Sequence, residues 1–269
     1  MNQLIPKNQS NSSANLLMKL WIYTNYDCNL SCPYCCAASS PKADRRCLSL
    51  ETVKRLVDEA QRLGFQHLYF TGGEPFLLKD LYEMLAYASD RLPTTVLTNA
   101  MLLRGKRLEK LCAIQHENLA VQVSLDGGRP EHHDAYRGMG SWAKTIEGIR
   151  NLQEYGFQVR LATTETPANS AHLPELCEYH QSLGIPEQDH LIRPMAKRGF
   201  AKTGLEVSKD NLTPEMTLSV NGVFWHPIST AADMQVSDQL FPLEKAVCRM
   251  QTELNVTKRQ SPEALNEFN

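Results

Sequence analysis

The chain has 269 residues, 42% of them hydrophobic, which is enough for one sizeable domain with a core and a small extension. Its 28 basic and 30 acidic residues nearly cancel and no basic run stands out, which argues against a nucleic-acid partner. No stretch reaches the roughly 18 consecutive apolar residues of a membrane span. Residues 1–15 lack the apolar centre of a secretion signal, so we expect a cytoplasmic protein with a disordered lead over residues 1–15 and no membrane partner.

Stretches typical of strands and helices alternate from residue 17 to about residue 195. The first helix is the clearest, because Ser49 can cap it, apolar residues recur at helical spacing from Val53, and Gly64 can end it. Repeated strand-then-helix steps imply parallel strands joined by right-handed crossovers. The fold class is therefore α/β, with a sheet that is either open and doubly wound or curved into a partial or full barrel. We expect strands over residues 17–26, 67–73, 94–99, 120–128, 157–166 and 190–194, and helices over residues 49–64, 80–91, 107–115, 141–156 and 171–184.

The chain changes character after residue 200. Residues 217–227 form two β-prone runs around Asn221 and Gly222, a pair that suits the two positive-φ positions of a type I′ turn. We therefore expect a β-hairpin there, followed by a helix over residues 241–255. The predicted domains are a barrel over residues 16–200 and a short C-terminal hairpin-plus-helix extension over residues 201–269.

The stretch CNLSCPYCC, residues 28–36, places four cysteines in nine positions. Cys28, Cys32 and Cys35 have the spacing C-x3-C-x2-C, and three thiolates on a short loop can hold three irons of a cube while the fourth iron stays open. Structural zinc usually takes four protein ligands, commonly from two separated C-x2-C pairs, and this chain has no second pair. A zinc loop completed by a distant histidine or cysteine remains the alternative. The other cysteines, Cys36, Cys47, Cys112, Cys177 and Cys248, receive no metal-binding role.

The segment TGGEP, residues 71–75, follows the second expected strand about 40 residues after the cysteines. CNLSCPYC followed by GGEP resembles the radical S-adenosylmethionine (radical SAM) superfamily, over roughly residues 17–195. The resemblance implies a partial (β/α)6 TIM-like barrel with a [4Fe-4S] cluster on Cys28, Cys32 and Cys35. It also implies that SAM binds the open iron, and that one electron splits SAM into methionine and a 5′-deoxyadenosyl radical that takes hydrogen from the substrate.

The residue types after the second strand suit such a cofactor. Gly72 and Gly73 lack side chains, so the backbone can approach the methionine end of SAM. Glu74 is an acceptor for a cationic amine, and Pro75 stiffens the segment. By the resemblance, this segment binds the SAM amino group.

Further cofactor contacts are expected at the ends of later strands. Ser124 and Asp126 are two apart and share a strand face, and the resemblance places Ser124 at the SAM ribose or carboxylate. Asp126 is also expected to contact SAM; the alternative is that it only forms part of a turn that ends the strand. Tyr34 is expected to set its backbone against the adenine, and Asn99 to lie at the cofactor. Arg137, in the segment HHDAYRG, is either a carboxylate-binding or a structural arginine.

Substrate-facing candidates follow the same logic. Thr98, Thr163, Glu165 and Arg193 end expected strands, as Asn99 does, and so should line the pocket. Glu165 and Arg193 are the candidate catalytic residues; Glu165 is either an acid or base or the ion-pair partner of Arg193. We expect His132 and His133 to be solvated loop residues.

The C-terminal region resembles the start of a SPASM or twitch extension, which is common in radical SAM enzymes that modify ribosomally made peptides. In that extension the hairpin supplies a cysteine to an auxiliary cluster, but here it carries Trp225, His226 and Pro227, and only Cys248 lies beyond residue 177. We therefore expect a single cluster. The truncated form resembles the cyanobacterial nif11-class maturases, including spliceases, which excise tyramine and leave an α-keto-β-amino amide. It implies a precursor peptide substrate, a separate leader-binding partner protein, and a reductant such as flavodoxin or ferredoxin.

Three functions remain open from the sequence. The first is a radical SAM enzyme acting on a peptide. The second is a radical SAM enzyme acting on a small metabolite, which the cysteine-poor extension and short length allow. The third is a non-enzymatic metal-binding module, and the GGEP segment argues against it because a structural site needs no SAM pocket.

Overall fold

The computed structural model describes residue 16 and residues 18–260. The expected disordered lead over residues 1–15 lies outside the described residues, as do residues 261–269. The described strands form one nine-stranded sheet in the order β6-β5-β4-β3-β2-β1-β7-β8-β9. The strands are β1 (Lys19–Tyr23), β2 (His67–Thr71), β3 (Thr94–Thr98), β4 (Leu119–Ser124), β5 (Gln158–Glu165), β6 (His190–Pro194), β7 (Thr217–Ser219), β8 (Gly222–Phe224) and β9 (Gln235–Ser237).

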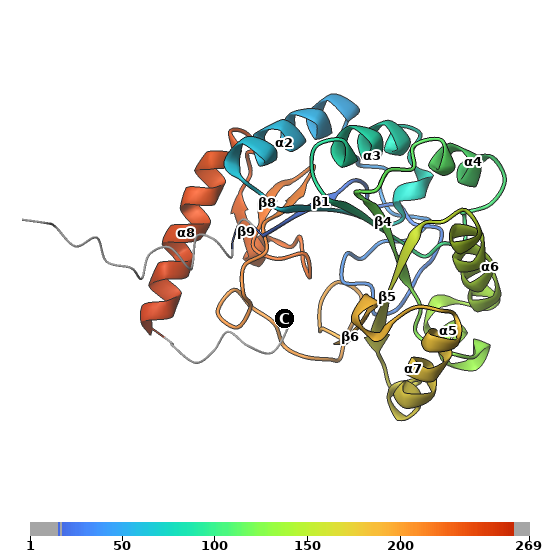
Figure 1. The fold of residues 1–269 in the computed structure, drawn as a ribbon. Coiled ribbons are helices and arrows are strands. Elements are labelled where there is room, and N and C mark those ends of the chain that lie inside the picture. The colour runs from blue at the N-terminus through green and yellow to red at the C-terminus, as the bar shows by residue number, and fades with distance from the viewer. Residues whose placement is uncertain (1–15, 17, 261–269) are drawn as a thin grey trace, which may run out of the picture.

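The first six strands are parallel and lie side by side in chain order, as the sequence predicts. Figure 1 shows this sheet curving, with α2, α3, α4 and α6 along its outer side, which is the arrangement of a partial barrel. The helices are α2 (Leu50–Leu63), α3 (Leu81–Ser89), α4 (Lys106–Cys112), α5 (Pro130–Arg137), α6 (Ser141–Glu154), α7 (Leu173–Ser182) and α8 (Leu243–Gln260). Parallel neighbours bring the loops after all six strands to one edge of the sheet, where the predicted site residues cluster.

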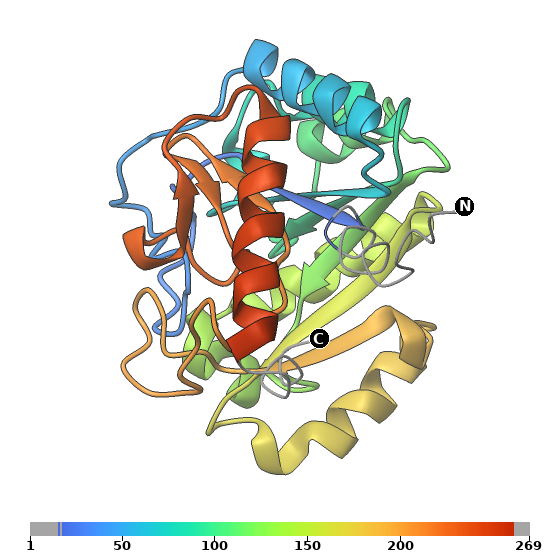
Figure 2. The same ribbon diagram turned by 90° about the vertical axis from the view of Figure 1, so that its left-hand side faces the viewer.

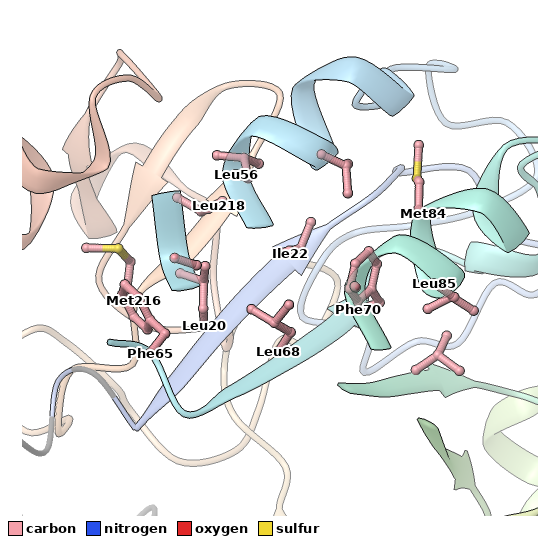
Figure 3. Close-up of a cluster of buried hydrophobic side chains, with 14 of the residues drawn as sticks. Leu20, Ile22, Leu56, Phe65, Leu68, Phe70, Met84, Leu85, Met216 and Leu218 are labelled. Carbon is pink, nitrogen blue, oxygen red and sulfur yellow. The ribbon is translucent and has the colours of Figure 1, made fainter. Parts of the chain in front are cut away.

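The first helix forms as its sequence predicts. The Ser49 side chain accepts a hydrogen bond from the Thr52 amide, and Gly64 ends the helix with φ 85°. The apolar face of α2 covers the outer face of the sheet. Each fully buried large apolar side chain contributes roughly 1.5–3 kcal/mol to folding stability. Figure 3 shows this part of the core, with Leu20, Ile22, Leu56, Phe65, Leu68, Phe70, Met84, Leu85, Met216 and Leu218 packed between strands and helices.

The extension continues the barrel sheet. β7 pairs in parallel with β1, and β8 and β9 follow as antiparallel neighbours, the last of which the sequence did not predict. Trp225 is buried and donates from its indole nitrogen to the Leu212 carbonyl at 3.1 Å, so it is part of the core of the extension. Helix α8 contacts α2 and β9, as Figure 2 shows, and the Leu243 amide donates to Glu59 Oε2 at 2.7 Å.

The predicted type I′ turn at Asn221–Gly222 is wrong. Gly222 pairs with Ser219 as the first residue of β8, so the two loop residues are Val220 and Asn221. Neither has positive φ, whereas Gly222 has φ 121°. A Cβ on Gly222 would lie 2.1 Å from the Ser237 carbonyl oxygen, so the glycine serves the close approach of β9.

The expected solvated loop around His132 and His133 is also wrong, because these residues belong to helix α5. His133 is fully buried, and its Nδ1 accepts from the Asp126 amide at 3.2 Å. His132 stacks on His172 with ring centroids 4.0 Å apart. This helix is hard to predict from the sequence, because its buried residue is a histidine and it lacks an aliphatic stripe. Pro130 at its first position does favour a helix start.

No helix of the described chain is long and apolar enough to cross a membrane.

The buried histidines make the folding stability of the protein depend on pH. His180 is 1% exposed, both of its ring nitrogens lack a hydrogen-bond partner among the described residues, and burial lowers its pKa to about 3. An unfolded histidine binds a proton near pH 6.5, so below that pH the unfolded state binds the extra proton and folding stability falls.

We predict that His180→Phe loses less stability than wild type when the pH falls from 7.5 to 5. The difference should approach about 2 kcal/mol, which is the protonation free energy of one unfolded histidine at pH 5. Urea unfolding of both proteins at both pH values measures it. Equal acid losses in the two proteins would show that His180 is not held neutral by the fold.

Candidate active site

A cavity of about 260 Å³ is lined by residues from β1 to β6, from the loops that follow these strands, and from residues 226–228 of the extension. A larger hollow of about 510 Å³ beside α8 is lined by none of the predicted site residues. Pro75, Asp126 and Glu165 do not line the smaller cavity. The predicted residues that do line it are Cys28, Cys32, Tyr34, Cys35, Gly72, Gly73, Glu74, Asn99, Ser124, Arg137 and Arg193, together with Thr98 and Thr163.

The three spaced cysteines reach this cavity as free thiols. Cys28 Sγ accepts from the Leu30 amide and Cys35 Sγ from the Ser39 amide, each at 3.4 Å. Amide hydrogen bonds to sulfur are typical of the surroundings of cluster thiolates, so this donor set fits an iron-sulfur cluster. Burial raises the pKa of the Cys28 thiol to about 12 and also raises that of Cys32. As they stand, the described residues contain no group of three His, Cys, Asp or Glu side chains that could hold a metal ion.

The two glycines after β2 allow a close approach between two loops. The Gly73 amide donates to the Asn25 carbonyl at 2.9 Å, and the Glu74 amide donates to the Asp27 carbonyl at 2.9 Å. A Cβ on Gly73 would lie 2.1 Å from the Asp27 carbonyl oxygen, and one on Gly72 would lie 2.6 Å from the Asn25 carbonyl oxygen. Glycine is therefore needed here to hold the GGEP segment against the chain that leads into Cys28.

Asn25, which the sequence did not single out, ties this contact together. Its buried amide nitrogen donates to the backbone carbonyls of Asp27 and Glu74, at 2.9 and 3.1 Å. Nothing in its sequence surroundings marks it, because its role arises only when β1 and β2 lie side by side.

The Glu74 carboxylate is buried and already has three donors. Oε1 accepts from the Phe76 amide at 3.1 Å and from Thr98 Oγ1 at 2.8 Å, and Oε2 accepts from the Asn99 amide at 2.9 Å. Burial raises the pKa of Glu74 to about 7 against the lowering effect of these bonds. Glu74 therefore fastens the loop after β2 to the end of β3, and Pro75 follows it as the first residue of the 3-10 helix Pro75–Leu77.

A second buried cluster joins the cysteine loop to β4. Asp126 is fully buried and accepts from Arg137 Nε at 2.6 Å, from the Thr164 amide at 2.9 Å and from the Tyr34 hydroxyl. Burial alone would raise the pKa of Asp126, but Arg137 and these hydrogen bonds hold it below its ordinary value. The sequence treated Asp126 and Arg137 as separate candidates; the structure pairs them.

The two predicted catalytic residues do not pair with each other. No Glu165–Arg193 ion pair occurs in the described chain, and Glu165 ends β5 outside the cavity wall. Arg193 lines the cavity from β6, and its Nε is buried without a hydrogen-bond partner among the described residues.

The extension supplies one wall of the cavity through His226, Pro227 and Ile228. The Tyr23 hydroxyl donates to the Pro227 carbonyl at 2.6 Å and so fixes this segment to β1. Burial, with a further contribution from Arg193, lowers the pKa of His226 to about 4, so its ring is neutral at pH 7. No role is expected for His226 from the sequence, because its place in the cavity wall follows from the pairing of β7 with β1.

Comparison with known proteins gives a family for this arrangement. The sequence profile of the Radical SAM superfamily matches residues 22–168, which is more than half of the chain. The chain is 33% identical to the AdoMet-dependent heme synthase of Methanosarcina barkeri, over 58% of this chain and 45% of that protein. It is 31% identical to the mycofactocin maturase MftC of Mycolicibacterium smegmatis, over 64% of this chain and 44% of that protein. The chain thus spans less than half the length of these curated relatives.

Among solved structures, SuiB from Streptococcus suis has a similar fold. The structure of SuiB bound to S-adenosylmethionine aligns with a TM-score of 0.61 at 20% identity, over 72% of this chain and 44% of SuiB. SuiB has also been solved bound to its precursor peptide SuiA. At this identity the likeness shows the fold alone, and it agrees with the parallel-sheet barrel.

We predict that Asp126→Asn destabilises the protein by about 3–5 kcal/mol, because it leaves the buried Arg137 charge uncompensated. Urea unfolding measures the loss. The matched control is Glu175→Gln, which removes an exposed ion pair with Arg129 and should cost at most about 1 kcal/mol. Combining Asp126→Asn with Arg137→Met should restore part of the loss. A cost below about 1 kcal/mol for Asp126→Asn alone would contradict a structural role for this pair.

Proposed function

The chain belongs to the radical SAM superfamily, and on that premise we propose that it is an enzyme that modifies a ribosomally made precursor peptide. The family uses a [4Fe-4S] cluster and SAM, which together supply a 5′-deoxyadenosyl radical when both are bound. The observation that carries the proposal is the single cavity that gathers the three spaced thiols, the GGEP segment and the ends of β3 to β6.

In this proposal Cys28, Cys32 and Cys35 hold the cluster and leave one iron without a protein ligand. The SAM side of the cavity is formed by Gly72, Gly73 and Glu74, together with Asn99 and Ser124, while Pro75 stiffens the segment behind the wall. Asp126 acts behind the wall, where it orients Tyr34 and Arg137. These residues exclude water and hold the reactants in place, which is how positioning lowers a barrier.

A peptide substrate is supported by relatives that carry the name of a maturase or are solved with a precursor peptide. The similarity to a heme synthase supports the alternative, a small metabolite as substrate. Within peptide modification, the specific reaction we propose to test first is tyramine excision, with a separate leader-binding protein and a flavodoxin or ferredoxin as partners. The extension has a single cysteine, the exposed Cys248 of α8, and this supports a single cluster.

We predict about four irons per chain in protein purified without oxygen, and fewer than about one in Cys32→Ala, because a cluster held by three thiolates does not survive loss of one. Cys248→Ala is the matched control, since this exposed thiol should leave the iron content unchanged. Iron analysis with absorbance spectra measures both. Full iron in Cys32→Ala, or zinc in its place in the wild type, would refute the ligand assignment.

The peptide assignment is tested with precursor peptides encoded beside this chain. With SAM and dithionite the protein should release 5′-deoxyadenosine and change the mass of one such peptide, and tyramine excision would appear as loss of a tyrosine-derived unit. Mass spectrometry of the peptide measures the change. Release of 5′-deoxyadenosine without a mass change in any neighbouring peptide would transfer the assignment to a small metabolite.

A further inference from the structure

Arg193 is a cation without a partner on the cavity wall. It lies in β6, opposite Thr164 of β5 in register, and both residues line the cavity. Its Nε is buried, and its guanidinium group makes no hydrogen bond or ion pair within the described chain. A buried charged donor without an acceptor costs folding free energy, so such a group normally forms a hydrogen bond to a protein partner or to a ligand.

The nearby acids are already occupied. Glu215 accepts from Lys19 Nζ at 2.7 Å and from Trp21 Nε1 at 2.6 Å. Asp126 is bound by Arg137, and Glu165 forms no ion pair with Arg193. Burial raises the pKa of Glu215, while Lys19 and, to a smaller extent, Arg193 lower it, so Glu215 lies within electrostatic reach of Arg193. Within the described chain, however, no carboxylate forms a hydrogen bond or ion pair with Arg193.

The other ionisable groups on the wall do not compensate Arg193 either. Arg137 is paired with Asp126, and the Glu74 carboxylate is fastened to the end of β3. The neutral His226 ring accepts from the Ile228 amide at 3.2 Å. Among the described wall residues, Arg193 is thus the cation without a hydrogen bond or ion pair, and Leu191 of β6 with Ala162 opposite it on β5 adds apolar surface to the same wall. Low polarity strengthens attraction for an anion.

We propose that Arg193 binds a carboxylate of the substrate and so fixes the substrate in the cavity. A carboxylate matches the planar guanidinium group, which can donate two parallel hydrogen bonds to it. That the carboxylate belongs to an Asp or Glu side chain or to the C-terminus of a peptide rests on the proposed function. The assignment of Arg193 to carboxylate binding does not depend on it.

The first experiment needs no known substrate. The cluster-loaded protein with SAM and without reductant is titrated by calorimetry with the α-amide of N-acetyl-L-glutamate, whose only carboxylate is its side chain, and with its neutral counterpart, the α-amide of N-acetyl-L-glutamine. Wild type should bind the carboxylate compound at least 10-fold more tightly, and Arg193→Gln should lose this preference. Arg193→Lys keeps the positive charge but loses the planar guanidinium group with its two parallel donors, so it should retain part of the preference for the carboxylate compound. Arg129→Gln, an exposed arginine outside the cavity, is the matched control and should behave as wild type.

Three results would overturn the proposal. Equal binding of the two compounds by wild type, or no binding of either, would show that the site does not select a carboxylate. Loss of SAM affinity by 10-fold or more in Arg193→Gln would make Arg193 a cofactor contact instead. If Arg193→Gln fails to fold, Arg193→Lys takes its place in the titration, because it preserves charge and approximate size. A preference for the carboxylate compound equal to that of wild type would then contradict the proposal.

The second experiment uses a precursor peptide that wild type modifies, with each Asp and Glu changed in turn to Asn and Gln and, in one further variant, with its C-terminus amidated. One such change should raise KM at least 10-fold with wild type and leave KM unaltered with Arg193→Gln. If every peptide change altered KM by the same factor with wild type and with Arg193→Gln, the pairing of Arg193 with a substrate carboxylate would be contradicted. If no peptide is modified, the proposed function fails while the titration still decides the role of Arg193.

Discussion

The candidate site depends on one close approach, between the loop after β2 and the segment that leads from β1 into the cysteines. Backbone amides of Gly73 and Glu74 bond to the carbonyls of Asn25 and Asp27, and a methyl group at Gly73 would lie 2.1 Å from a carbonyl oxygen. Protein interiors are close-packed and cannot absorb such an overlap. The contact also sets Glu74, whose carboxylate then holds the end of β3, so three consecutive strands share one rigid edge.

The cysteine loop is fixed to its surroundings at two further places. Tyr34 lies between Cys32 and Cys35 in sequence, and its hydroxyl donates to Asp126, which also accepts from Arg137 and from the Thr164 amide near the end of β5. On another side, the Phe200 amide donates to the Cys35 carbonyl at 3.0 Å. A cysteine loop held in this way keeps a fixed place at the cavity wall, and a reactive site requires such support from the residues around it. The extension adds a wall to the same cavity through its pairing with β1, so barrel and extension together shape the space for a substrate.

Sequence reasoning predicted the parts of the fold that local signals encode. The Ser49 cap, the Gly64 stop, the six parallel strands and the shared cavity of cysteines and GGEP segment are all present in the structure. It missed what depends on distant partners: helix α5 packs through His133, and Gly222 is explained by β9 instead of by a turn. For the same reason Asp126 and Arg137 could be suspected singly but not paired, and the isolation of Arg193 could not be foreseen. The domain boundary at residue 200 stays a prediction.

We propose that the three thiols of the cavity would hold a cluster with one iron free for SAM. Electron paramagnetic resonance of the dithionite-reduced protein, recorded without and with SAM, tests it most directly. We expect a reduced [4Fe-4S] signal whose shape changes when SAM is added, because SAM would bind at the iron that lacks a protein ligand. A reduced cluster signal that SAM leaves unaltered would mean that the fourth iron is already occupied, and it would contradict the account.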